Sequence, residues 1–129
     1  MSFGVIMLVH SPLARAAEVV RFWARAHVPV AIHIDASAPE AETQAFREEL
    51  SGLQDVSFTR RIRSPWGSWG LVEASLLGAQ ALLSRYPQIG HVALTSGSCL
   101  PIKPAKLLQA HLRLHPDVDF IESFRPDRA

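Results

Sequence analysis

The stretch that decides the fold is "FGVIMLVHSPLARAAEVV", residues 3–20. Its first seven residues form an uninterrupted apolar run, which predicts a strand over residues 3–9 that is buried on both faces. Ser11 offers a helix N-cap, Pro12 suits a first helical turn, and the apolar residues that follow recur at helical spacing. The stretch therefore predicts a buried strand joined by a short turn to an amphipathic helix.

The rest of the chain repeats this alternation. Further strands are expected over residues 28–34, 56–58, 91–95 and 118–121. Helices are expected from the capping-box pair Ser37 and Glu40 to about Leu50, from Trp69 to Ser84, and from Pro104 to about His115. In the second of these helices, Leu71, Val72, Leu76, Ala79 and Leu83 are expected to face inward. Alternating strands and helices predict an α/β fold, with a mainly parallel sheet covered by helices on both faces.

Composition narrows the class of protein. The chain has 129 residues, 48% hydrophobic and 19% charged, which fits one folded domain over residues 1–129. A formal net charge of +1 gives no electrostatic reason to expect a nucleic-acid partner. Cys99 is the single cysteine, so a reducing compartment is expected. No stretch approaches the length of a membrane span, and a soluble cytoplasmic protein is the expectation.

Sheets of this kind bind ligands in the crevice at the carboxyl ends of their strands. This rule selects residues 10–12, 33–35, 60–70 and 96–103. Neither a G-x-G-x-x-G motif nor a Walker sequence follows the first strand, which disfavours dinucleotide oxidoreductases and P-loop enzymes.

Several candidates have a structural alternative. Asp35 could accept a hydrogen bond from a nucleobase or a ribose, or could cap the turn before Ser37. His10 and His33 are more often structural histidines than ligands. Arg63, with Arg60 and Arg61, could meet a diphosphate or form a solvated edge, and Lys103 could face a phosphate or solvent.

The segment "SPWGSWGLVEASLL", residues 64–77, places two tryptophans at a tight bend. An exposed indole there offers a flat apolar wall for a sugar or a base, while Gly67 and Gly70 permit the turn and a close approach. We expect Trp66 to line a ligand pocket and Trp69 to pack into the domain. In the loop after the fourth strand, Gly97 would likewise let the backbone approach a ligand.

The sequence offers no metal site. Its six histidines are scattered, without carboxylates or thiolates at zinc spacing. The "DVD" at residues 117–119 has the D-x-D spacing of a divalent-metal site, but it begins the expected fifth strand, at the edge opposite the ligand crevice. It is interpreted as turn chemistry.

Taken in order, "LVHS", "AIHIDASAP", "SPWGSWGLVEASLL", "LTSGSCLPIKP" and "DFIES" resemble one family across most of the chain. The chain resembles glycosyltransferase family 14, the core-2/I-branching β-1,6-N-acetylglucosaminyltransferases and the peptide O-xylosyltransferases. The resemblance implies a GT-A-type, Rossmann-like three-layer fold. It also implies a UDP-sugar donor and inverting transfer of GlcNAc or xylose to a glycan or protein hydroxyl, with no metal and no other cofactor.

The resemblance also implies roles for individual residues. Val9 and His10 would border the nucleotide, Asp35 would contact the uracil, and Trp66 and Gly67 would shape the donor pocket. The loop of Ser96, Gly97, Ser98 and Cys99 would lie beside the diphosphate and the sugar. Cys99 stands where many members carry Asp, which weakens any role for a carboxylate there.

No catalytic residue is assigned to this chain, because the family's catalytic base is a Glu well downstream of the matched segments. Glu73 lies on a helix matched to a non-catalytic family position, and Glu122 ends the last matched strand. The chain is therefore expected to be the donor-binding, N-terminal part of a longer transferase, inactive alone and partnered by the remainder of that protein. The alternative is a non-catalytic module that keeps the fold, with or without nucleotide binding.

Overall fold

The computed structural model describes residues 3–122, which form an α/β domain. The predicted alternation is confirmed, with most boundaries within two residues. The elements are, in chain order, β1 (Phe3–Val9), α1 (Ala14–Arg25), β2 (Val30–Ile34), α2 (Glu40–Leu50), β3 (Val56–Phe58), α3 (Trp69–Arg85), β4 (His91–Ser96) and α4 (Ala105–Leu114).

The sheet is parallel throughout and has the strand order β3-β2-β1-β4. The chain moves from β1 outward through β2 to β3 and then returns to the other side of β1. β1 is therefore flanked on both sides, with Val9 opposite Ile34 of β2 and Leu8 opposite Ser96 of β4. The direction of winding reverses between β1 and β4, which makes this pair the topological switch point of the sheet.

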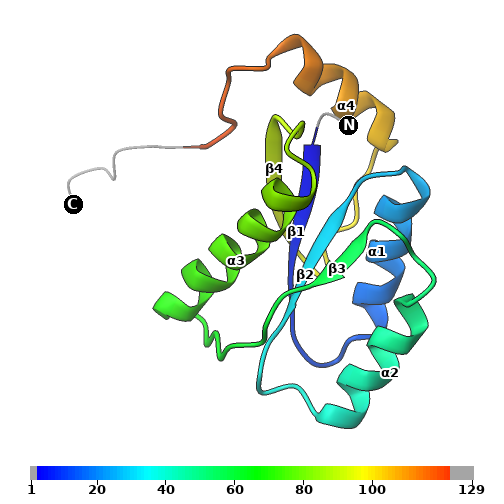
Figure 1. Cartoon of the computed structure of the whole chain (residues 1–129), viewed down its shortest axis with the longest axis vertical. Coiled ribbons are helices and arrows are strands. Elements are labelled where there is room, and N and C mark those ends of the chain that lie inside the picture. The colour runs from blue at the N-terminus through cyan, green and yellow to red at the C-terminus, as the bar shows by residue number, and fades with distance from the viewer. Residues whose placement is uncertain (1–2, 123–129) are drawn as a thin grey trace.

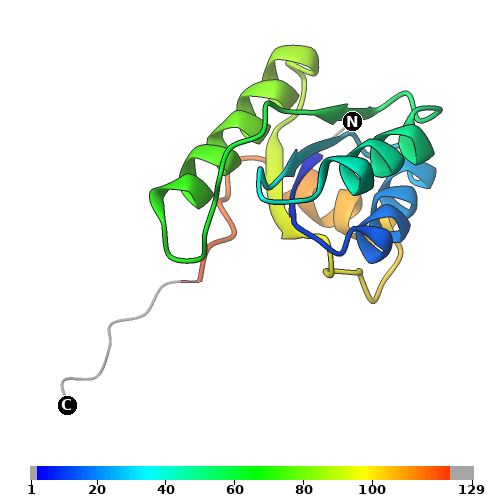
Figure 2. The same cartoon turned by 90° about the horizontal axis from the view of Figure 1, so that it is seen from below.

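Helices cover both faces of the sheet, which gives the predicted Rossmann-like architecture (Figure 1). α1 and α2 lie on one face and α3 lies on the other, as the view along the sheet shows (Figure 2). α4 joins the α1 side, where its Ala105 and Leu112 enter the same apolar cluster. The three layers follow from strands whose two faces are both apolar.

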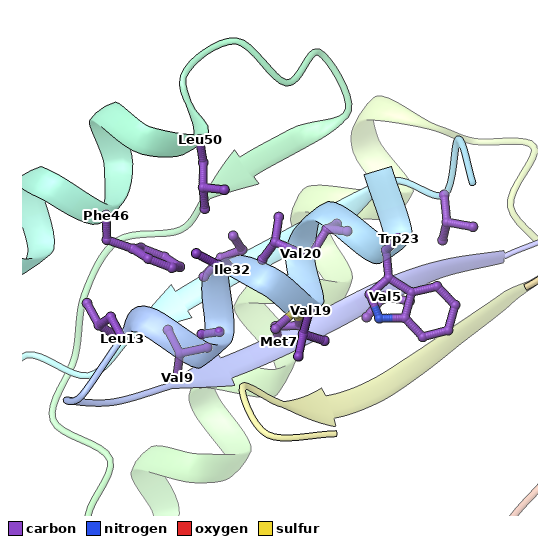
Figure 3. Packing of buried hydrophobic residues seen from close by; sticks show 14 of the residues in the cluster. Val5, Met7, Val9, Leu13, Val19, Val20, Trp23, Ile32, Phe46 and Leu50 are labelled. Carbon is purple, nitrogen blue, oxygen red and sulfur yellow. The ribbon is translucent and has the colours of Figure 1, made fainter. Parts of the chain in front are cut away.

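The larger core lies between the sheet and α1 (Figure 3). Alternate β1 residues point toward it, as the two-residue period of a strand requires. They meet side chains of α1, and Phe46 and Leu50 of α2 close the far end. The residues of β1 and α1 in this cluster are Phe3, Val5, Met7, Val9, Ala16, Ala17, Val19, Val20 and Trp23.

The inward face of α3 differs from the expected one. Ala74, Gly78 and Leu82 are buried against the sheet. Of the residues expected to face inward, Ala79 packs against this cluster, whereas Val72, Leu76 and Leu83 are exposed. The reason is close packing, because a Cβ at Gly78 would lie only 2.5 Å from Ile6 Cγ2. The small residues let α3 approach β1, so the larger apolar side chains remain on its outer face.

The predicted N-caps of α1 and α2 are also wrong. Leu13 and Pro39 occupy the two N-cap positions, and neither makes a side-chain cap hydrogen bond. Instead, Glu42 in the first turn of α2 accepts hydrogen bonds from the Ser11 hydroxyl and the Leu13 N–H, each 2.7 Å long. A carboxylate from the neighbouring helix thus satisfies the start of α1, where negative charge is favourable.

The fifth strand predicted over residues 118–121 does not form. The segment approaches the start of β4 through a side chain, since Val118 O lies 3.0 Å from Nε2 of His91. Phe120 packs among His91, His111 and His115. These contacts hold the segment without the regular backbone ladder that a strand needs.

No helix within residues 3–122 has the length and apolar character needed to cross a bilayer.

Candidate functional site

A pocket of about 430 Å³ opens at the switch point of the sheet, between the carboxyl ends of β1 and β4. Its position is the one that the winding of the sheet favours for a ligand. One side is β1 and the turn that follows it, and the other is the loop after β4. The lining residues are Leu8, Val9, His10, Pro12, Arg15, Ala16, Ser96, Gly97 and Ser98.

The loop after β4 is seated directly on α1. A Cβ at Gly97 would lie 2.9 Å from Ala16 Cβ and 3.1 Å from Val9 Cγ1, so a larger side chain would push the loop outward. Within the loop the hydroxyls of Ser96 and Ser98 lie 3.1 Å apart. The sequence predicted that Gly97 would let the backbone approach a ligand. In the structure Gly97 lets the loop pack on α1 and β1, which places the hydroxyls of Ser96 and Ser98 at the mouth of the pocket.

Cys99 continues this turn but does not line the pocket. Its N–H donates to Ser96 O over 3.2 Å, and its Sγ lies 3.1 Å from Ser96 Oγ. Hydrogen bonding to Ser96 lowers the pKa of the Cys99 thiol. Cys99 is exposed beside the pocket, where its thiol helps to close the turn.

The end of β2 holds the segment that follows β3. His33 is 1% exposed, and its Nε2 accepts the Ile62 N–H over 3.0 Å, which places the ring proton on Nδ1. Burial lowers the pKa of His33, so the imidazole stays neutral and remains an acceptor. Nearby, the Ala36 N–H donates to Ile62 O over 3.0 Å. β3 is short, but these hydrogen bonds hold the chain that follows it, at Ile62, against the end of β2.

Asp35 completes the same attachment. Its Oδ1 accepts the Ser37 N–H over 2.7 Å, and its Oδ2 accepts both the N–H and the hydroxyl of Ser64, over 2.9 and 2.7 Å. The turn cap considered from the sequence is therefore present, and the carboxylate also anchors the start of the tryptophan bend. Burial alone would raise the pKa of Asp35, but the hydrogen bonds from Ser37 and Ser64 outweigh it and hold the pKa well below its usual range.

The lowered pKa of Asp35 predicts how stability depends on pH. A carboxyl group with a depressed folded pKa stabilises the fold above its unfolded pKa of about 3.9, and this contribution is lost as the pH falls toward the folded pKa. Asp35→Asn should lower the free energy of unfolding by about 1–3 kcal/mol at pH 7, because an amide N–H would face donors that now have an acceptor. Urea titrations between pH 7 and pH 2.5 should show the deficit shrinking below about pH 4.

The control for this experiment is Asp117→Asn, which changes an exposed carboxylate in a turn. It should leave the stability unchanged across the same pH range. A deficit in Asp35→Asn that stays constant down to pH 2.5 would contradict the assigned cause.

The tryptophan bend needs both of its glycines. Gly67 has φ +74°, a backbone conformation that side-chain-bearing residues rarely adopt. A Cβ at Gly70 would lie 2.3 Å from Arg63 O and 3.0 Å from Ser64 Cα, so the first turn of α3 packs directly on the incoming chain. One glycine thus permits the turn and the other the close approach.

The bend leaves both tryptophans in solvent. Trp66 is 97% exposed, and Trp69 is 72% exposed, so the expectation that Trp69 packs into the domain is wrong. The physical reason is the position of Gly70. Within the first turn of α3, Gly70 packs against Arg63 and Ser64. Trp69 lies on the outer face of the helix, with the exposed residues Val72 and Leu76.

The basic residues upstream of the bend have separate roles. Arg60 pairs with Glu73 at 2.8 Å. Arg61 donates to Asp35 O, Ala36 O and Ala38 O and pairs with Glu40, so it closes the turn after β2. Arg63 is exposed. Lys103 is also exposed and lies outside the lining of the switch-point pocket.

A larger pocket of about 830 Å³ lies between β4, α4 and the segment before residue 122. It reaches the amino end of β4, where Phe3, His91 and Phe120 contribute to its lining. Asp119 of the "DVD" segment lies there as well, away from the carboxyl edge as expected. We place the ligand site in the smaller pocket, because that pocket lies at the switch point and carries hydroxyl, imidazole and guanidinium groups together.

A family model described as "Branch: Core-2/I-Branching enzyme" matches residues 5–129. The chain belongs to the Core-2/I-Branching enzyme family. It is therefore a glycosyltransferase-family domain, and the resemblance in its sequence motifs is confirmed. No curated protein matches the chain.

In this Core-2/I-Branching domain the structure divides the predicted site residues into two groups. Val9, His10, Ser96, Gly97 and Ser98 line one pocket. The other group lies outside the lining of that pocket: Asp35 at the end of β2, and Trp66 and Gly67 in the bend that Asp35 anchors through Ser64.

Arg15 also lines this pocket of the Core-2/I-Branching domain, although it was not predicted from the sequence. A basic residue in the first turn after the switch-point strand is the signal that could have found it.

Proposed function

We propose that this domain binds the nucleotide of a UDP-sugar at the switch-point pocket. In the proposal it serves an inverting, metal-independent transferase that moves GlcNAc or xylose to a hydroxyl acceptor. The observation that carries the proposal is the position of the pocket, where the ends of β1 and β4 and the loop of Ser96 to Ser98 converge. Membership of a glycosyltransferase family supports a sugar donor as the ligand.

The proposed roles follow the two groups of residues. Val9 and His10 border the nucleotide, and the loop from Ser96 to Cys99 lies beside the diphosphate and the sugar. The carboxylate of Asp35 already accepts three hydrogen bonds, so a contact with the uracil would use one of its remaining lone pairs. Its larger contribution is to hold the bend that carries Trp66, whose exposed indole would form an apolar wall for the sugar.

In the proposed reaction the acceptor oxygen attacks the anomeric carbon of the donor sugar. The bond from this carbon to the diphosphate breaks, UDP leaves with the electron pair, and a general base takes the proton of the acceptor hydroxyl. We assign no base within residues 3–122. The glutamates near the starts of α2 and α3 are each bonded to another segment: Glu40 to Arg61, Glu42 to Leu13, and Glu73 to Arg60. The base would come from another part of the transferase.

Calorimetric titration with UDP, with and without Mn²⁺, tests the proposal. We expect UDP to bind weakly and with the same affinity in both conditions, because the proposed contacts are made by the protein alone. Binding that requires Mn²⁺ would contradict the metal-independent reading. Complete absence of binding in both conditions would contradict a nucleotide site in this domain.

A further inference from the structure

The polar lining of the switch-point pocket favours an anion. It consists of the imidazole of His10, the guanidinium of Arg15 and the hydroxyls of Ser96 and Ser98, and none of the lining residues is acidic. Hydroxyl and guanidinium groups are the donors that proteins use for phosphate oxygens. The chemistry of the pocket therefore differs from that of a site built for a neutral sugar alone.

Arg15 is placed to serve such an anion. It is the second residue of α1, and side chains on a helix lean toward its N-terminus, here toward the end of β1. Arg21, Arg60 and Arg61 pair with glutamates, whereas Arg15 makes no ion pair with any residue from 3 to 122. Arg15 thus adds to the pocket lining a positive charge that no carboxylate of the described chain pairs with.

Backbone packing brings the first turn of α1, which carries Arg15, close to the loop of the two serines. Gly97 packs against Ala16, the residue next to Arg15, so the loop of Ser96 and Ser98 lies close to the first turn of α1. A guanidinium on one wall and two hydroxyls on the other can bind different oxygens of one phosphate group. Arg supplies planar paired donors for this purpose, which Lys cannot copy.

We infer that Arg15, with Ser96 and Ser98, binds the diphosphate of the nucleotide donor and stabilises the charge that UDP carries as it leaves. This inference rests on the proposed function and adds a phosphate-binding residue to it. In the reaction, the bond between the sugar and the diphosphate breaks, and the negative charge grows on the oxygen that leaves. A cation beside that oxygen lowers the free energy of the transition state.

The test compares the wild type, Arg15→Ala and Arg15→Lys in calorimetric titrations with UDP, uridine and inorganic diphosphate. Arg113→Ala is the matched control, because it removes one exposed positive charge at the end of α4, outside the pocket lining. Arg15→Ala should weaken binding of UDP and of diphosphate about 10- to 100-fold and leave uridine binding unchanged. Arg15→Lys should be intermediate, and Arg113→Ala should match the wild type.

The outcomes separate this inference from the proposed function. If Arg15→Ala binds UDP like the wild type, the inference is overturned and the proposed function stands. If wild-type protein binds diphosphate through Arg15 but binds UDP no more tightly, the phosphate site stands and the nucleotide proposal fails. If wild-type protein binds neither ligand, both are overturned. Thermal melts of each variant verify that the fold is intact.

Discussion

Trp23→Ala should lower the free energy of unfolding by about 3–5 kcal/mol, the usual cost of truncating a large buried aromatic side chain. Trp23 is 4% exposed and lies between α1 and the sheet. Its ring meets Phe3 and Phe22 edge-on, with centroids 5.8 and 5.1 Å away. The expected loss is a large share of the roughly 5–15 kcal/mol that stabilises a typical domain. Guanidinium denaturation at neutral pH measures it.

Trp69→Ala is the matched control for Trp23→Ala, because it removes the same side chain from an exposed position. It should change the free energy of unfolding by no more than about 0.5 kcal/mol. A loss in Trp69→Ala as large as that in Trp23→Ala would mean that the indole of Trp69 is buried in solution. The arrangement of the bend described above would then be wrong.

Gly70→Ala should cost about 1–3 kcal/mol of stability and should also weaken UDP binding. The added Cβ would lie 2.3 Å from a backbone oxygen, that of Arg63, so a rigid segment must move. The movement would strain the hydrogen bonds from Ser64 to Asp35 and shift the bend that carries Trp66. Chemical denaturation and a UDP titration on the same preparation measure the two effects.

Gly52→Ala provides the comparison for Gly70→Ala. A Cβ at Gly52 would meet nothing within 4 Å, and its φ lies outside the left-handed range. The substitution should be neutral or slightly stabilising, since alanine has less backbone freedom in the unfolded chain. Equal stability of the Gly52 and Gly70 variants would show that the contact between α3 and Arg63 is loose.

Much of the fold could be predicted because its strands are short apolar runs separated by turn residues. β1 and β3 occupy the residues expected of them, and the parallel arrangement follows from the helices between the strands. The segment 118–121 has the same apolar character, yet it contacts the start of β4 through the His91 imidazole. A local pattern cannot show whether a partner strand is free to pair.

The inward face of α3 was not predictable from apolar spacing, because this helix has apolar residues on more than one side. Close contact between Gly78 and Ile6 chooses the face with small side chains, and this choice depends on the distance between helix and sheet. The same limit explains Trp69. Its environment is decided by how Gly70 meets the chain at Arg63.

The site was predictable to the extent that it follows the ends of strands. His10 and the loop from Ser96 to Ser98 were found by that rule and lie in one pocket. Arg15 was missed because it lies inside a helical pattern, where a basic residue usually faces solvent. The hydrogen bonds of Asp35 with Ser64 join positions 29 residues apart, and no local spacing reveals them.

The central claim is that the switch-point pocket binds a nucleotide, and amide NMR spectra of the chain during a UDP titration test it most directly. We expect the largest shift changes at Val9, His10 and Arg15 and in the loop from Ser96 to Cys99, with smaller changes at Asp35 and Ser64. Changes confined to the neighbourhood of His91 and Phe120, which line the larger pocket at the other end of β4, would contradict the account.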